Sequence, residues 1–118
     1  MSADTPSPFD DNAVIALQGT DWVDDVPGIR AREVDVDGRR WAIVEYGPGA
    51  RREEYCLDGH AGYVLEGEIE YEFSDGEQPM VVSQGDAFTL ATGRGHRGRN
   101  TRGSSSSRLF LIDDPAAD

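Results

Sequence analysis

Short runs of β-branched and aromatic residues, each closed by a turn signal, restrict this chain to an all-β fold. The clearest run is Glu68–Phe73, whose strict alternation places its apolar residues on one face and three glutamates on the other. Asp37-Gly38 and Asp75-Gly76 are hairpin signals that separate such runs. No stretch of useful length has the periodicity of an amphipathic helix. The pattern therefore predicts an antiparallel sandwich or jelly-roll barrel.

The 118 residues are enough for one domain and too few for a second. Residues 1–12 and 114–118 lack apolar periodicity, so we expect a disordered or extended N-terminal segment, a domain over 13–113 and a flexible C-terminal tail. The strands are expected near Val14–Leu17, Ile29–Val36, Arg40–Tyr46, Arg52–Leu57, Ala61–Leu65, Glu68–Phe73, Met80–Ser83, Ala87–Leu90, His96–Asn100 and Arg108–Ile112.

The charge balance excludes some partner classes. The chain has 23 acidic and 11 basic residues, a formal net charge of −12, so nucleic acid and an anionic membrane surface would both repel it. Neither a transmembrane stretch nor a signal peptide is apparent, and we expect a cytoplasmic protein. The single cysteine, Cys56, cannot form an intramolecular disulfide, which agrees with a reducing compartment.

One segment near the C-terminus has a spacing that points to a family. Gly85, Gly93, His96 and Asn100 follow the pattern G-x5-P-x-G-x2-H-x3-N, with Ala91 at the proline position. This resembles the second motif of the cupin superfamily. The resemblance implies an antiparallel double-stranded β-helix, the cupin jelly-roll barrel, in which His96 is a metal ligand. It also implies a small single-domain cupin that forms a homodimer.

The resemblance continues upstream but departs at the residues that carry the chemistry. Gly67 fits the last position of the first cupin motif, G-x5-H-x-H-x3,4-E-x6-G, and counting back from it places His60 where the family has glutamate. With a three-residue spacer, the two histidine positions fall on Glu54 and Cys56. The segment therefore resembles the motif at its end and differs from it at its metal-binding start.

The four-residue spacer would place Glu53 and Tyr55 at those positions instead. The shorter spacer is preferred because Glu54 and Cys56, two apart on a predicted strand, point to the same face and both carry atoms that bind metals. The candidate metal ligands are Glu54, Cys56, His60 and His96.

Two imidazoles and a carboxylate match the ligand set of non-haem iron oxygenases, whereas an added thiolate favours zinc or a thiolate-bound iron. Iron or zinc is therefore expected first, and nickel or manganese next. We expect a metal-dependent enzyme of dioxygenase, isomerase or lyase type acting on a small organic molecule. The alternatives are a non-catalytic ligand-binding or regulatory cupin without a functional metal centre, and a barrel with a closed structural zinc.

Other side chains are candidates for contact with substrate. Arg94, in the loop before the predicted strand at His96, could attract an anionic molecule. Tyr63 and Tyr46 lie on predicted strands, where packing in the core competes with lining a pocket. Alternation turns Arg97 and Arg99 away from His96, so these two are expected to pair with glutamates or with a partner subunit.

Overall fold

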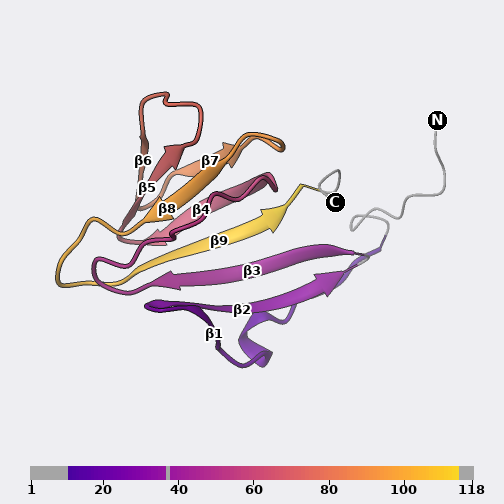
Figure 1. The fold of residues 1–118 in the computed structure, drawn as a ribbon. Coiled ribbons are helices and arrows are strands. Elements are labelled where there is room, and N and C mark those ends of the chain that lie inside the picture. Colours follow the sequence, from indigo (N-terminus) through magenta and orange to yellow (C-terminus); the bar gives the residue numbers. More distant parts are fainter. Residues whose placement is uncertain (1–10, 37, 115–118) are drawn as a thin grey trace, which may run out of the picture.

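The computed structural model describes residues 11–36 and 38–114, and within them the chain forms nine strands and one 3₁₀ turn (Figure 1). The turn, η1, spans Leu17–Gly19. The strands are β1 (Val23–Val26), β2 (Ile29–Val36), β3 (Arg39–Tyr46), β4 (His60–Glu66), β5 (Glu68–Phe73), β6 (Met80–Ser83), β7 (Ala87–Leu90), β8 (His96–Arg99) and β9 (Ser107–Asp113).

The strands form two antiparallel sheets (Figure 1). The larger sheet has six strands in the order β1-β2-β3-β9-β4-β7, and the smaller has three in the order β6-β5-β8. Buried side chains of the two sheets form one hydrophobic core, because alternate residues of each strand face inward. The predicted all-β class and the two-sheet antiparallel jelly-roll architecture are confirmed.

The core consists of apolar and aromatic residues from both sheets. Its members are Ile29, Ala31, Ala42, Val44, Tyr46, Val64, Ile69, Tyr71, Val82, Phe88, Leu90, Leu109 and Leu111. Between β4 and β5 the chain passes from one sheet to the other at Gly67, whose φ of +80° is a conformation that favours glycine. A Cβ there would also meet the Ser107 hydroxyl at 2.4 Å, so this corner requires glycine.

Most predicted strands are present, and the pattern of Glu68–Phe73 is confirmed by burial of Ile69 and Tyr71. The strand predicted at Val14–Leu17 is wrong. The chain there turns on itself, since the Leu17 amide donates to the Ile15 carbonyl, and the 3₁₀ turn follows. The sequence pattern also missed β1, an edge strand whose four residues are all exposed and therefore show no alternation.

The strand predicted at Arg52–Leu57 is wrong as well. Residues 51–57 form two isolated bridges with β8 instead of a strand, Arg51 with Arg99 and Cys56 with His96. Four residues separate the bridges on the segment and two separate them on β8, so the segment must bulge away between them. The bulge is important because it sets where Glu54 and Cys56 lie.

Within the described ranges, no helix is long and apolar enough to cross a membrane. The predicted disorder of residues 1–12 falls mainly on residues 1–10, which lie outside the described part of the chain. The predicted flexibility of the C-terminal tail concerns residues 115–118, which lie outside it too.

Candidate metal centre

Three side chains able to bind a metal meet between the two sheets. His60 begins β4, His96 begins β8, and Cys56 lies in the bulged segment before β4. The backbones of Cys56 and His96 exchange hydrogen bonds of 2.8 and 3.0 Å, which fixes the two residues side by side. One donor atom from each of the three side chains lies within 4.8 Å of the other two. A single ion could therefore contact all three.

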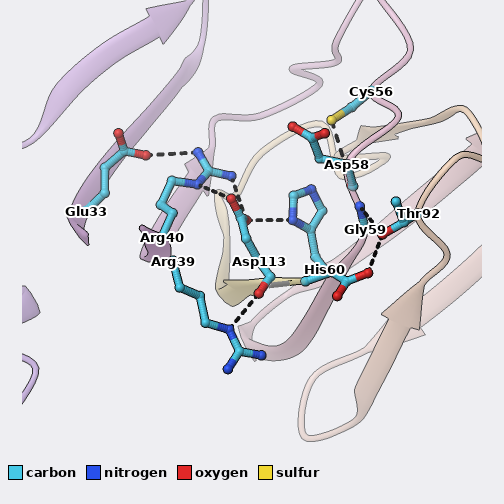
Figure 2. A network of polar contacts seen from close by, with 10 residues as sticks. Glu33, Arg39, Arg40, Cys56, Asp58, Gly59, His60, Thr92 and Asp113 are labelled. Atoms are coloured by element: carbon cyan, nitrogen blue, oxygen red, sulfur yellow. Dashed lines mark hydrogen bonds and ion pairs between the residues drawn. The ribbon is translucent and has the colours of Figure 1, made fainter. Parts of the chain in front are cut away.

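His60 is held by a residue that the sequence analysis did not identify. Its Nδ1 lies 2.8 Å from a carboxylate oxygen of Asp113, and the two residues are direct cross-strand partners on β4 and β9. The other ring nitrogen is directed to the side where Cys56 lies (Figure 2). Because Nδ1 is engaged by the carboxylate, Nε2 is the nitrogen available to a ligand.

Asp113 is itself held from the neighbouring strand β3 (Figure 2). The Arg40 guanidinium lies 3.3 Å from the Asp113 carboxylate and donates to Glu33 of β2 at 2.9 Å. Arg39 donates to the Asp113 backbone carbonyl at 2.8 Å, at the end of β9. A row of polar contacts therefore crosses β2, β3, β9 and β4 and ends at His60.

The electrostatics of the three-residue group favour the charged forms of Cys56 and His60. Contacts with the imidazoles of His60 and then His96 lower the pKa of the Cys56 thiol from 9.0 to about 6. Burial disfavours the charged form of His60, but hydrogen bonds to Asp113 and Cys56 outweigh it and raise the pKa of His60 from 6.5 to about 9. The same contacts with His60 and with Arg40 lower the pKa of Asp113 despite its partial burial. These shifts favour a Cys56 thiolate beside a His60 imidazolium in the metal-free protein, and a bound metal ion would replace the proton on Nε2.

His96 provides an independent indication of a ligand. It is only 4% exposed, and its Nδ1 is buried without a hydrogen-bond partner among the described residues. Its ring contacts those of His60 and Tyr71 edge-on, with centroid separations of 5.2 and 5.9 Å. A buried nitrogen without a partner is unfavourable. The donor set and this unsatisfied atom are both consistent with a metal ion bound here.

The three side chains line a cavity of about 510 Å³. Tyr46 also lines it, and its hydroxyl accepts a hydrogen bond of 3.1 Å from Arg52, which pairs with Asp25 at 2.7 Å. Gly98 leaves the space open, because a Cβ there would lie 2.8 Å from the Tyr46 hydroxyl. The complete lining is Asp25, Arg40, Val44, Tyr46, Arg52, Glu54, Tyr55, Cys56, Asp58, His60, Tyr71, His96, Gly98, Leu111 and Asp113.

The remaining predicted site residues lie apart from the three-residue group. Glu54 is exposed on the bulge and lines the cavity, but its carboxylate is not part of the group. Arg94 does not line the cavity; it pairs with Asp75 at 2.8 Å and with Glu77 at 3.2 Å. Tyr63 is 42% exposed and is also outside the lining.

The outward-facing arginines behave as the alternation predicted. Arg99 pairs with Glu70 at 2.8 Å, and Arg97 lies 3.6 Å from Glu72. Both contacts join β8 to its neighbour β5 on the outside of the small sheet.

The other positions of the glycine-rich motif have structural roles. Gly85 and Gly93 have φ values of +92° and +86°, which explains why both turns use glycine. Asn100 is 2% exposed, and its side-chain amide donates to the backbone carbonyls of Gly47 and Ser105. The motif thus places His96 inside and secures the loops around the strand that carries it.

Residues 42–113 match the family model described as the Cupin domain, which covers more than half of the chain. The chain is a cupin. No curated protein sequence matches this cupin significantly. The second cupin motif is present in its sequence, whereas its first motif departs from the usual pattern of the family.

Solved structures with the same fold are distant in sequence. KdgF from Halomonas sp. is 23% identical, with a TM-score of 0.68 over 92% of this cupin and 97% of that chain. An RmlC-like cupin from Shewanella frigidimarina is 18% identical, with a TM-score of 0.68 over 84% and 86%. The polyketide cyclase RemF from Streptomyces resistomycificus is 17% identical, with a TM-score of 0.69 over 86% and 78%. At this identity the likeness establishes the fold.

Proposed function

We propose that this cupin is a metal-dependent enzyme that acts on a small organic molecule in the cavity, with Cys56, His60 and His96 as the protein ligands. The observation that carries the proposal is the meeting of one donor atom from each side chain within 4.8 Å in the cavity wall. Three protein ligands leave a further coordination position open, which a catalytic site needs for water or substrate. The neighbour RemF, named a polyketide cyclase, is one enzyme with this fold.

The donor set favours zinc or iron. A thiolate with two imidazoles is a soft set that suits both, and nickel or manganese follow. Bound there, a divalent ion would polarise a substrate oxygen or lower the pKa of a water molecule. Glu54, expected from the sequence as a fourth ligand, lies outside the three-residue group and is left out of this proposed ligand set.

The residues around the group would bind and orient the substrate. The Tyr46 hydroxyl accepts a hydrogen bond from Arg52, so its own proton remains available for a substrate oxygen in the cavity. Val44 and Leu111 supply apolar wall beside it. A cavity of about 510 Å³ has the size expected for a small-molecule site.

The charges of the lining favour a neutral substrate with hydroxyl or carbonyl groups. Arg40 and Arg52 are each paired with a carboxylate, whereas Glu54 and Asp58 have no ion-pair partner among the described residues. An anion would meet repulsion from these carboxylates. The anionic preference suggested by Arg94 is not supported by the lining, because Arg94 is outside it.

A second candidate function is a non-catalytic ligand-binding cupin without a metal. The observation that favours it is the pairing of Cys56 with His60 and of His60 with Asp113, which stabilises all three side chains without an ion.

Homodimer formation stays a prediction under either function, and sedimentation velocity would test it.

Cobalt(II) titration of the metal-free protein separates the two functions. Under the proposed function, one equivalent binds, a thiolate-to-cobalt absorption band appears in the near ultraviolet, and added azide changes the visible bands by entering the open position. A band that azide leaves unchanged would indicate a closed structural site. No binding at all would support the metal-free cupin and contradict the enzyme proposal.

A further inference from the structure

The strongest unassigned feature is the row of polar contacts that leads to His60. It consists of Glu33, Arg40 and Asp113, on three adjacent strands of the large sheet (Figure 2). We propose that Asp113 is a positioning residue for the metal centre, fixing the orientation and tautomer of His60, and that Arg40 holds the Asp113 carboxylate in place. The inference rests on the proposed function, because it concerns how the group presents itself to a metal.

The first argument is geometric. His60 and Asp113 are opposite one another on β4 and β9, and the 2.8 Å contact engages Nδ1. An imidazole whose Nδ1 donates to a carboxylate has Nε2 free for a metal, and such a carboxylate also makes the imidazole a better ligand. Asp113 therefore decides which nitrogen faces Cys56 and His96.

The second argument is the rigidity of the carboxylate. The Asp113 side chain is 22% exposed, and it is clamped from β3 by the Arg40 guanidinium. Arg39 holds the Asp113 backbone carbonyl, so the last residue of β9 is fixed at both its main chain and its side chain. Glu33 fixes Arg40 in turn from β2. A surface ion pair with no further role would not need this arrangement across four strands.

The third argument is the contrast with His96. His96 is buried, and its Nδ1 has no hydrogen-bond partner in the described part of the chain, whereas the Nδ1 of His60 contacts Asp113. The two histidines therefore enter the group in different states: His60 is preoriented by the protein, and His96 is held by burial and by its backbone bond to Cys56. Loss of the Asp113 carboxylate should affect the His60 side of the centre alone.

The experiment measures cobalt(II) and zinc affinity of the metal-free full chain for the wild type, Asp113→Ala, Asp113→Asn and Arg40→Gln. We expect Asp113→Ala to weaken affinity by about 10- to 100-fold, the usual effect of losing a partner of a ligating histidine. Asp113→Asn should lose less metal affinity than Asp113→Ala, because its amide oxygen still accepts a hydrogen bond from His60 Nδ1. Arg40→Gln should also lose less affinity than Asp113→Ala. In Asp113→Ala the visible cobalt bands should shift as His60 loses its fixed orientation.

Asp114→Ala is the matched control. It removes the same charge from the next residue, whose carboxylate accepts a hydrogen bond from Thr92, and its affinity should stay within about twofold of the wild type. A purely structural role for Asp113 predicts a lower unfolding midpoint of the metal-free variants with wild-type affinity and spectrum, and that result would overturn the inference. If Asp113→Ala does not fold, the metal affinities and cobalt spectra of Asp113→Asn and Arg40→Gln test the inference in its place. Absence of metal binding in the wild type would overturn the proposed function and the inference together.

Discussion

Replacement of Asn100 by alanine tests what the last residue of the glycine-rich motif does. Its side-chain amide lies 3.2, 3.0 and 2.8 Å from the carbonyls of Tyr46, Gly47 and Ser105, and its carbonyl accepts from the Arg102 amide at 2.9 Å. Alanine removes all four contacts. Each buried group left without a partner costs about 1–3 kcal/mol, but water can reach some of these part-buried groups. We expect a total loss of about 3–4 kcal/mol in the free energy of unfolding.

The aspartate variant makes the test more specific. Asn100→Asp retains the acceptor for the Arg102 amide but removes both N–H groups and places a carboxylate against carbonyl oxygens. It should destabilise the fold at least as much as alanine does. Thr101→Ala is the control, because the exposed Thr101 hydroxyl donates to Glu68 at the surface, and its effect should stay within about 0.5 kcal/mol.

Urea denaturation of the metal-free variants, followed by far-ultraviolet circular dichroism, measures these differences. If the slope of the unfolding free energy against urea concentration is the same in all variants, a shift in the midpoint reports a change in stability rather than a change in the unfolded state. A loss below about 1 kcal/mol in Asn100→Ala, or a wild-type midpoint in Asn100→Asp, would refute the reasoning, since the network would then not hold the loops.

Three further predictions concern the cavity and its thiol. Gly98→Ala places a methyl group 2.8 Å from the Tyr46 hydroxyl and should destabilise the protein by about 1–3 kcal/mol in thermal unfolding. Gly103→Ala is the control and should be nearly neutral, because nothing lies within 4 Å of its new Cβ. Equal effects of the two variants would contradict the packing argument. In the metal-free protein, the rate at which iodoacetamide reacts with Cys56 should rise with pH and have its midpoint at pH about 6, because the thiol is deprotonated above that pH. A midpoint near pH 9 would show that the imidazoles do not lower the pKa of the thiol. Glu54→Gln should change cobalt affinity by less than about threefold, because the Glu54 carboxylate is outside the three-residue group; a loss of about tenfold or more would establish Glu54 as a ligand after all.

The sequence predicted the fold well because its strands alternate clearly. The bounds of β2, β5, β6 and β7 coincide with the predicted runs, since each has one face in the core and one in water. The failures have local causes. β1 is exposed on both faces and so carries no alternation. Residues 51–57 form two isolated bridges with β8 that are spaced unequally on the two chains, which residue propensities do not reveal.

The candidate site was predictable in part. His60, His96 and Cys56 were found because they occupy motif positions, and the structure brings them together. Asp113 was missed because the predicted strand ended one residue before it. Its signal was present in the sequence: it continues the inward-facing series of Leu109 and Leu111 on β9.

Arg40 and Arg52 could not have been found from the sequence. Their place in the cavity depends on pairing between strands that are distant in the chain, and nothing in their local sequence distinguishes them from the other arginines.

The central claim is that Cys56, His60 and His96 bind a metal, and the most direct test is the metal content of protein purified without a histidine tag. Inductively coupled plasma mass spectrometry should find close to one zinc or iron per chain in the wild type, and most of it should be lost in His96→Ala. Wild-type protein that is folded, carries no metal and takes up none when zinc or iron(II) is added would contradict the account.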